Sequence, residues 1–370
     1  MRTVLAVVGA RPNFMKMAPI VAELERRPQE FSSVLVHTGQ HYDEAMSRIF
    51  LEELGVGAPH FMLGVGSGSH AQQTARVMER LEPVLLEVRP DIVLVPGDVN
   101  STLAASLVAS KLGMPVGHVE AGLRSYDRSM PEEINRVVAD AVSEQLFVHS
   151  PEAVENLLRE GVARERIHAV GNTMIDTLVS MRERIETLMA PERLGLQRGA
   201  YLVVTLHRPA LVDTPLLFDA MRALEQLALS LPVVFPVHPR TRAALEAHGF
   251  ANSDSALTLL DPVGYLEFLG LVGAAAGVLT DSGGIQEETT FLGIPCFTLR
   301  ANTERPVTCS IGTNTLLGLA PERILDVPDL LRSFGEREHA VPDGWDGHAA
   351  GRLVDVLAQV LAVPAAPAAA

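Results

Sequence analysis

The chain has 370 residues, of which 47% are hydrophobic, and this supplies enough apolar material for two packed cores. The formal net charge of −15 argues against general nucleic-acid binding, which needs a basic surface. Two cysteines cannot build a disulfide scaffold. No apolar stretch is long enough to span a bilayer, and no secretory signal follows Met1, so we expect a cytoplasmic protein without a membrane partner.

Short apolar runs alternate with amphipathic patterns along almost the whole chain. This alternation predicts parallel sheets whose strands are joined by right-handed helical crossovers. The predicted buried strands are Thr3–Val8, Ser33–Val36, Asp91–Val95, Pro115–Val119, Gln145–Val148, Tyr201–Thr205, Val233–Val237, Leu257–Leu260, Gly277–Thr280 and Pro295–Leu299. The predicted helices are Phe14–Arg26, Asp43–Leu54, Ala71–Val88, Ser101–Leu112, Glu132–Val142, Thr173–Met189, Thr214–Leu229, Arg240–His248, Gly264–Val272, Ile285–Leu292 and Gly351–Leu361.

The alternating series starts afresh after Pro191, which follows a long predicted helix. We therefore predict two α/β domains, residues 1–171 and 172–345, with the boundary at Gly171–Asn172. A C-terminal helix within 346–362 is expected to pack back on the N-terminal domain. The Ala/Pro-rich tail, residues 363–370, is expected to be disordered.

Open α/β sheets bind their ligands at the carboxyl ends of the strands, so the loops after the predicted strands are the candidate site. The first such loop is Gly9–Asn13, where a glycine permits a tight turn and a helix follows at once. Arg11 would offer a charged fork to a phosphate, and Lys16 would face the same pocket one helical turn later. In the alternative interpretation, Gly9 is only a turn and Arg11 a solvated surface group.

Three carboxylates follow strands of the N-terminal domain. Asp98 lies in the loop after the predicted strand Asp91–Val95, at the carboxyl end of that strand, although it could also cap the next helix. Glu120 lies in an apolar run, where a carboxylate is costly to bury without a partner or a purpose. Glu132 opens a helix and shares a face with Arg136, although glutamate is also ordinary in a first helical turn. Clustered carboxylates are suited to proton transfer to and from carbon.

The second half offers groups that suit a diphosphate. His207 and Arg208 follow one predicted strand, and Ser282, Gly283 and Gly284 open a helix after another. Small residues at a helix start let the backbone approach a phosphate, and the serine hydroxyl adds a donor. Glu288, just over a turn later, could accept hydrogen bonds from ribose hydroxyls.

Two further residues of these loops have plain structural interpretations. Asp281 could simply cap the helix that follows it, and Arg240 is expected to be exposed at a turn.

Nothing in the sequence predicts a cofactor or a metal. The segment Gly64–Ser69 resembles a dinucleotide-binding motif but ends in serine and does not follow the first strand, so a flexible loop is the preferred interpretation. The histidines lie on separate loops, and no Cys/His cluster has the spacing of metal ligands.

Taken together and in order, these loops resemble the non-hydrolysing UDP-N-acetylglucosamine 2-epimerase family. The resemblance spans about Val4 to Leu317. It rests on Gly9-Ala10-Arg11-Pro12, Thr38-Gly39-Gln40-His41, Pro96-Gly97-Asp98, Gly117–Arg124, Pro131–Arg136, Gly171-Asn172-Thr173, Leu206-His207-Arg208, Asp281–Glu288 and Thr303-Glu304-Arg305-Pro306.

This resemblance implies two Rossmann-like domains of GT-B type with the active site in the interdomain cleft. It implies inversion at C2 of a UDP-sugar by elimination and re-addition of UDP through a 2-acetamidoglucal, in cell-surface polysaccharide biosynthesis, by a homodimer. The implied catalytic residues are Asp98, Glu120, Glu132 and His207. The implied substrate- and UDP-binding residues are Arg11, Lys16, Arg136, Phe268, Ser282, Gly283, Gly284 and Glu288.

The chain departs from the family's common motifs at several positions, among them Ala10, Asn13, Tyr42-Asp43 and Pro209-Ala210. The last two pairs lie where such enzymes hold an activating second substrate, which puts that activation in doubt here. The variant motifs also resemble relatives acting on diacetamido sugars, so a related UDP-diacetamido sugar is an alternative substrate. A GT-B glycosyltransferase and a non-catalytic nucleotide-sugar sensor are the competing functions.

Overall fold

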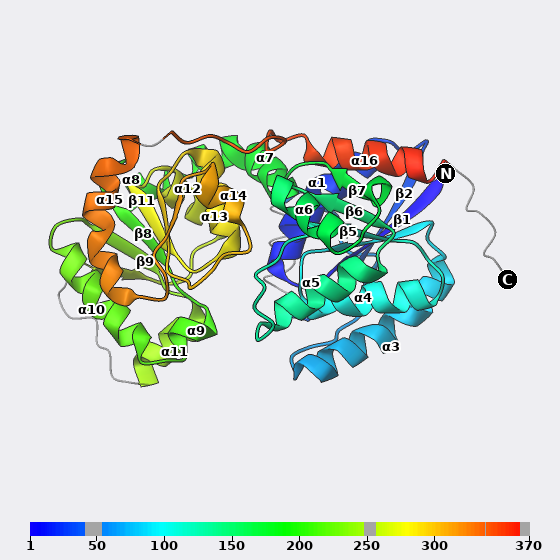
Figure 1. The fold of residues 1–370 in the computed structure, drawn as a ribbon, viewed down its shortest axis with the longest axis horizontal. Coiled ribbons are helices and arrows are strands. Elements are labelled where there is room, and N and C mark those ends of the chain that lie inside the picture. Colours follow the sequence, from blue (N-terminus) through cyan, green and yellow to red (C-terminus); the bar gives the residue numbers. More distant parts are fainter. Residues whose placement is uncertain (41–53, 248–256, 337, 363–370) are drawn as a thin grey trace. The chain divides into compact units, whose positions relative to one another are not determined.

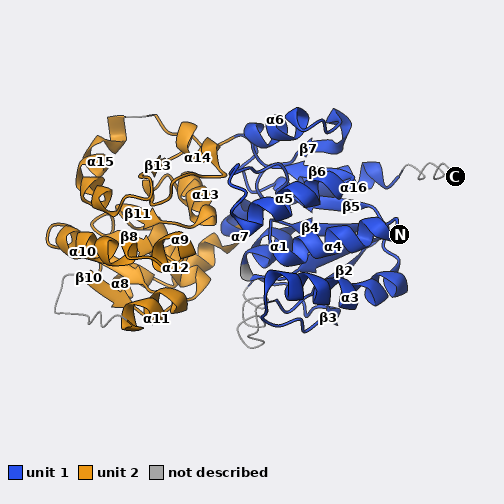
Figure 2. Ribbon diagram, turned by 60° about the horizontal axis from the view of Figure 1, so that its bottom comes forward, with its two compact units in different colours: residues 1–179, 343–370 blue, residues 180–342 orange. Residues whose placement is uncertain are grey.

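The computed structural model describes residues 1–40, 54–247, 257–336 and 338–362, and of Arg11 it describes the backbone only. The chain divides into two compact units, which Figure 2 colours separately. Unit 1 comprises Met1–Val179 and Asp343–Ala370, and unit 2 comprises Ser180–Pro342.

The sheet of unit 1 has seven parallel strands in the order β3-β2-β1-β4-β5-β6-β7. Helices lie on both sides of it (Figure 1). The strands are β1 (Arg2–Val8), β2 (Phe31–His37), β3 (Phe61–Met62), β4 (Ile92–Pro96), β5 (Val116–Val119), β6 (Gln145–Val148) and β7 (Ile167–Ala169). The described helices are α1 (Arg11–Glu25), α3 (His70–Val88), α4 (Asn100–Lys111), α5 (Pro131–Val142), α6 (Pro151–Arg159), α7 (Thr173–Thr187, which runs on into unit 2) and α16 (Ala349–Val360).

The sheet of unit 2 has six parallel strands and repeats the same winding, in the order β10-β9-β8-β11-β12-β13. The strands are β8 (Leu202–Thr205), β9 (Val233–Pro236), β10 (Leu257–Leu260), β11 (Gly277–Thr280), β12 (Cys296–Thr298) and β13 (Asn314–Leu316). The helices are α8 (Ala190–Arg193), α9 (Pro209–Val212), α10 (Leu216–Ala228), α11 (Pro239–Ala247), α12 (Tyr265–Gly273), α13 (Gly283–Leu292), α14 (Pro306–Ser310) and α15 (Val327–Ser333).

The predicted fold class, two α/β units with parallel Rossmann-like sheets, is confirmed. Every predicted strand is present within two residues at each end, because buried β-branched and leucine runs mark parallel strands clearly. The strands β3, β7 and β13 were not predicted, since runs of two or three residues carry no periodicity. The predicted helix at Asp43–Leu54 lies almost wholly outside the described residues, as do His248 and the tail 363–370.

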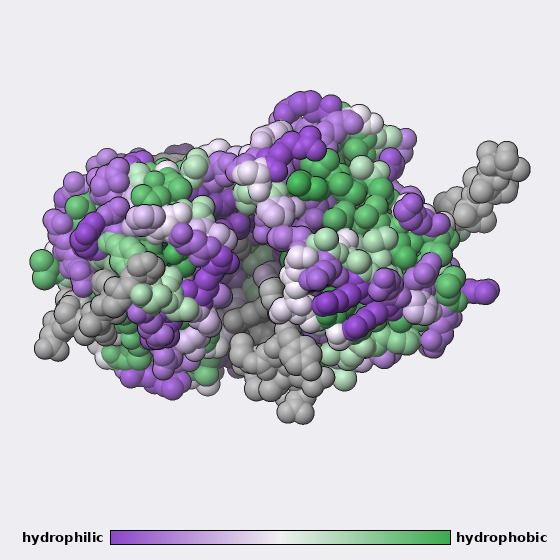
Figure 3. All heavy atoms as spheres, turned by 90° about the horizontal axis from the view of Figure 1, so that it is seen from below, coloured by the Kyte–Doolittle hydropathy of each residue, from purple (hydrophilic) through white to green (hydrophobic). Residues whose placement is uncertain are grey.

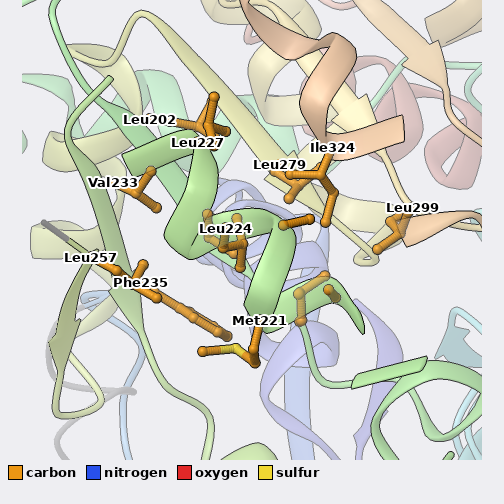
Figure 4. Packing of buried hydrophobic residues seen from close by; sticks show 14 of the residues in the cluster. Leu202, Met221, Leu224, Leu227, Val233, Phe235, Leu257, Leu279, Leu299 and Ile324 are labelled. Atoms are coloured by element: carbon orange, nitrogen blue, oxygen red, sulfur yellow. The ribbon is translucent and has the colours of Figure 1, made fainter. Parts of the chain in front are cut away.

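The core of unit 2 shows why these segments pack as they do. Helix α10 packs a leucine-rich face against the strands, and Leu224 and Leu227 belong to a cluster with buried residues of β8, β9, β10, β11 and β12, most of which Figure 4 labels. Burial of this apolar surface is the main favourable contribution to folding of the unit.

Three hydrogen bonds hold the segment that begins at Asp343, where the chain re-enters unit 1 after unit 2. The indole of Trp345 is buried and donates to the carbonyl of His149 at 2.7 Å. The Asp176 carboxylate accepts the first backbone N–H groups of α16, from Ala349 and Ala350, at 3.1 and 2.7 Å. These contacts hold the first half of α7 with unit 1, so the division falls after Val179 rather than at the predicted boundary.

Helix α16 packs against α1 within unit 1. The predicted flexible loop before α3 is instead held by that helix, since Arg76 donates to the carbonyls of Val65 and Ser67 at 3.3 and 3.2 Å. Among the described residues, no helix is both long and apolar enough to cross a membrane. Hydrophilic and hydrophobic residues are interleaved on the face shown in Figure 3.

Two glycines of unit 1 give a matched test of backbone packing. Gly161 and Gly171 both have a positive φ, +85° and +90°. A methyl group on Gly171 would lie 1.9 Å from the carbonyl oxygen of Gly344, whereas a methyl group on Gly161 would meet no atom within 4 Å. We expect Gly161→Ala to cost about 1–2 kcal/mol of unfolding free energy, for the left-handed backbone alone. Gly171→Ala should cost a further 1–3 kcal/mol or so, because a backbone carbonyl must move.

Urea unfolding followed by tryptophan fluorescence measures this difference. The single tryptophan, Trp345, is buried in unit 1 and therefore reports that unit. Equal losses in the two variants would contradict the close approach of residues 171 and 344.

Candidate active site

Several candidate residues of each unit lie in the loops where its strand order reverses. In unit 1 the reversal lies between β1 and β4, and in unit 2 between β8 and β11. Chain connections leave such a pair of strands in opposite directions, and this opens a crevice at their carboxyl ends. The loops after these strands carry Asp98 in unit 1, and His207 and Ser282 in unit 2.

Asn13 joins the two loops of unit 1. Its side-chain oxygen accepts the N–H groups of Gly9 and Ala10 at 3.1 and 3.2 Å, and its nitrogen donates to the carbonyl of Pro96 at 3.1 Å. The side chain is 2% exposed. One amide therefore sets the distance between the loop after β1 and the loop that carries Asp98.

Asp98 is held by a buried arginine. Arg136 Nη1 lies 2.6 Å from Asp98 Oδ2, and Arg136 Nη2 donates to Glu133 Oε2 at 2.8 Å. Glu133 also accepts from the backbone N–H groups of Ser125 and Tyr126, both at 2.9 Å. Burial would raise the pKa of Glu133, but Ser125 and Arg136 outweigh it and lower that pKa. Glu133 is thus a permanent anion that fixes Arg136 against Asp98.

On helix α5 it is Glu133, and not Glu132 with its expected shared face, that pairs with Arg136. Arg136 points from the buried face of α5 and pairs with Asp98 and Glu133, whereas Glu132 is half-buried at the first turn of the helix. Spacing of four residues allows a shared face but does not choose between adjacent glutamates. Glu133 is therefore a site residue that the sequence analysis missed.

Glu120 has the partner that its burial requires. It forms an ion pair with Lys16, and both side chains are about 7% exposed. A methyl group on Gly97 would lie 2.8 Å from Lys16 Nζ, so this lysine lies against the loop of Asp98 as well. Glu120 has φ of +69°, a left-handed backbone that costs a non-glycine residue about 1–2 kcal/mol. Strain of this kind gathers at functional sites.

In unit 2 a buried aspartate supports His207. His207 Nδ1 lies 3.0 Å from Asp281 Oδ1, and Asp281 Oδ2 accepts the N–H groups of His207 and Arg208 at 2.8 and 2.7 Å. Burial would raise the pKa of Asp281, but His207 and these backbone donors outweigh it and lower that pKa. Asp281 does not cap α13, whose N-cap residue is Ser282, so the capping interpretation is wrong.

Helix α13 begins against a cluster of arginines. A methyl group on Gly283 would lie 2.5 Å from Arg305 Nη1 and 2.8 Å from Glu304 Oε1, so a larger residue there would displace this ion pair. Glu304 also pairs with Arg300 at 2.7 Å and lies 3.8 Å from Arg208. Burial would raise the pKa of Glu304, but Arg305 and Arg300 hold it far below its usual range.

The remaining candidates of unit 2 lie on neighbouring helices. The oxygen Glu288 Oε1 accepts from the hydroxyl of Tyr265 at 2.7 Å, and Glu288 is 1% exposed. Ser282 and Gly284 are half-buried, and the Ser282 side chain makes no capping hydrogen bond. Phe268 packs on the edge of a core cluster. Arg240 is exposed, as predicted, and pairs with Asp213.

The two sites differ in chemical character. Unit 1 presents Asp98 beside Arg136 and Glu120 beside Lys16, and such pairs can accept or release a proton while the cation balances the charge. Unit 2 presents a helix amino terminus, guanidinium groups and an imidazole, which suit an anionic group. The side chain of Arg11 and all of His41 lie outside the described residues.

Comparisons with known proteins identify the family of the chain. A family model described as UDP-N-acetylglucosamine 2-epimerase matches residues 22–358. A protein of Methanococcus maripaludis named UDP-N-acetylglucosamine 2-epimerase is 42% identical over 92% of this chain and 95% of its own. A Pseudomonas aeruginosa protein named UDP-2,3-diacetamido-2,3-dideoxy-D-glucuronate 2-epimerase is also 42% identical, over 87% of this chain and 90% of its own.

A solved structure extends the likeness to three dimensions. The crystal structure of Methanocaldococcus jannaschii UDP-GlcNAc 2-epimerase in complex with UDP-GlcNAc and UDP has a TM-score of 0.87 and 38% identity. The likeness covers 96% of this chain and 99% of that one. The chain therefore belongs to the UDP-N-acetylglucosamine 2-epimerase family and is an epimerase.

Proposed function

We propose that the protein interconverts UDP-N-acetylglucosamine and UDP-N-acetylmannosamine by elimination and re-addition of UDP through a 2-acetamidoglucal. The C2 hydrogen of this sugar is not next to a carbonyl, so enolisation is unavailable. Loss of the C1–O bond builds positive character at C1, and this makes the C2 hydrogen removable as a proton. Re-addition of UDP with protonation on the other face of C2 gives the epimer.

The observation that carries this proposal is the pair of carboxylates around Gly97. Asp98 is paired with Arg136, and Glu120 with Lys16. The reaction needs one group to remove a proton from C2 and a group to return one on the opposite face. Two carboxylates supported by separate cations meet that need better than one.

The proposal assigns the nucleotide to unit 2. Gly283 and Gly284 would offer backbone N–H groups to the diphosphate, Ser282 its hydroxyl and His207 its imidazole. Glu288 would bind the ribose and Phe268 would lie at the base. In unit 1, Glu132 and Arg11 are assigned to the sugar and the diphosphate by resemblance to the family. We further propose that the enzyme is a homodimer in the cytoplasm, which light scattering on the purified protein and cell fractionation would check.

The first test is the reaction itself. The purified protein with UDP-N-acetylglucosamine in heavy water should yield UDP-N-acetylmannosamine by NMR, with deuterium at C2 in both sugars. Intact substrate without deuterium, at high enzyme concentration, would contradict the proposal. Free N-acetylmannosamine with UDP would indicate a hydrolysing enzyme, and transfer to an added acceptor would indicate a glycosyltransferase.

The likeness to the Pseudomonas aeruginosa protein favours a second sugar. UDP-2,3-diacetamido-2,3-dideoxyglucuronate should be offered in parallel, and the two kcat/KM values compared. A clear preference for the diacetamido sugar would keep the reaction type and replace the substrate.

Substitutions should separate chemistry from binding. Asp98→Asn and Glu120→Gln should each lower kcat by about 10²–10⁴-fold, because a proton-transfer group is lost, with UDP affinity little changed. Ser282→Ala and Glu288→Gln should instead weaken UDP binding by about tenfold or more in calorimetry. Glu155→Gln, on the exposed face of α6, is the matched control and should leave both unchanged. Normal kcat in Asp98→Asn would remove Asp98 from the chemistry.

Asp281 gives a separate test of the role of His207. Asp281→Asn keeps the shape but removes the charge that faces His207 Nδ1 and two backbone N–H groups. We expect kcat to fall about 10–100-fold, because the imidazole loses its fixed orientation. The pH profile of kcat should shift with it. An unchanged pH profile would show that Asp281 only holds the backbone.

A further inference from the structure

Three successive carbonyls of the Asp98 loop are held by side chains from other elements. The carbonyl of Pro96 accepts from Asn13 Nδ2 at 3.1 Å and from Thr102 Oγ1 at 2.6 Å. The carbonyl of Gly97 lies 2.7 Å from His118 Nε2. The carbonyl of Asp98 accepts from Asn135 Nδ2 at 2.9 Å. Of these donors, only the histidine can gain or lose its donor hydrogen near neutral pH.

Both ring nitrogens of His118 face oxygen atoms that only accept. Nε2 lies 2.7 Å from the carbonyl of Gly97, and Nδ1 lies 2.6 Å from Asp140 Oδ1. A carbonyl and a carboxylate have no hydrogen to offer, so both nitrogens must carry one. His118 is 0% exposed, and water cannot replace either partner.

The surroundings of His118 balance its charge. Asp140 accepts from Gly122 N at 3.1 Å and pairs with Arg124 at 2.7 Å, and Arg124 is bound by Glu160 at 2.6 Å. Burial would raise the pKa of Asp140, but His118 and Arg124 outweigh it and lower that pKa. Asp140 is therefore ionised. With a charged His118 these four groups sum to zero, and the outermost of them, Glu160, has a side chain that is 39% exposed.

The other charged groups near the loop are already engaged. Lys16 lies against Gly97 and pairs with Glu120. Asp98 pairs with Arg136, which is also bound by Glu133. Among the described residues, the groups that decide the charge of His118 are thus Asp140 directly and Arg124 and Glu160 behind it.

The contact with Gly97 sets the direction of one peptide group. The Gly97 carbonyl and the Asp98 N–H belong to the same planar trans peptide, so they point in opposite directions. With the carbonyl turned into the core toward His118, the Asp98 N–H points outward, and it has no hydrogen-bond partner among the described residues. Gly97 has φ of +65°, and a glycine offers little steric resistance to rotation of this peptide.

We propose that His118 is a positioning residue, a buried imidazolium that keeps the Gly97–Asp98 peptide with its carbonyl inward. The Asp98 N–H then serves as a backbone donor to an oxygen of the sugar nucleotide, next to the Asp98 carboxylate. Loss of the Nε2 hydrogen bond would free the peptide to turn, which removes that donor and moves the carboxylate. This inference rests on the proposed role of Asp98 in the reaction.

The charge of His118 can be measured without substrate. Ring-nitrogen NMR of the protein labelled with heavy nitrogen in its histidines should show one residue with hydrogen on both nitrogens at about pH 8, where an ordinary histidine is neutral. The signal is assigned by its loss in His118→Gln. A single unprotonated nitrogen on His118 at that pH would overturn the proposal, whatever the protein catalyses.

Two variants separate the two hydrogen bonds of the ring. In His118→Gln the side-chain amide reaches the place of Nε2 and can still donate to Gly97, while in His118→Asn the amide replaces Nδ1 and can serve only Asp140. We expect His118→Gln to keep kcat within about tenfold of the wild type. His118→Asn should lower kcat about 100-fold, because the catalytic loop is misplaced.

Binding measurements distinguish this role from a general loss of structure. UDP affinity and the fluorescence of Trp345 should match the wild type in both variants, since unit 2 carries the nucleotide. Equal kcat in His118→Gln and His118→Asn, in a wild type that does epimerise, would overturn the inference alone. A wild type without epimerase activity would instead overturn the proposed function and leave the NMR result to decide the charge of His118.

Discussion

The site depends on one constraint: each charged group at the carboxyl edge of a sheet needs an opposite charge beside it. A charge buried alone costs several kcal/mol, a large part of the total stability of a domain. Unit 1 meets the constraint with Lys16 beside Glu120 and Arg136 between Asp98 and Glu133. The chain has a net charge of −15, so an anionic ligand needs cations gathered close to its site.

The fold could be predicted because the strands of a parallel sheet appear in the sequence as short, continuous apolar runs. Runs such as Ile92–Pro96 are buried on both faces and contain no polar residue, and each is followed by a helical period. The strand ends then identify the loops, and the loops contain the candidate residues. Asp98 and Glu120 could be chosen in this way, because an acid at a buried strand end is rarely accidental.

The partners of those residues could not be predicted, because they come from distant parts of the chain. Asp98 pairs with an arginine 38 positions away, and Lys16 with a glutamate more than 100 positions away. At Glu132 and Glu133 the sequence offers two adjacent acids, and only the direction of the Arg136 side chain chooses the second. The sequence around Asp281 suggests a helix cap and hides its contact with His207, because this contact joins the ends of two strands that are distant in sequence but adjacent in the sheet.

Each unit contains a buried aspartate beside a histidine, and the two pairs serve different purposes. Asp140 and Asp281 are both buried, both accept backbone N–H groups and both lie against Nδ1 of a histidine. What differs is the second ring nitrogen. In His118 it is bound to the carbonyl of Gly97 inside the core, so the ring can only hold the chain. The His207 side chain is 35% exposed and its Nε2 has no partner among the described residues, so this nitrogen is left able to form a hydrogen bond with a ligand. Burial of Nε2 thus decides whether the histidine of such a pair holds the backbone in place or is available to bind the substrate.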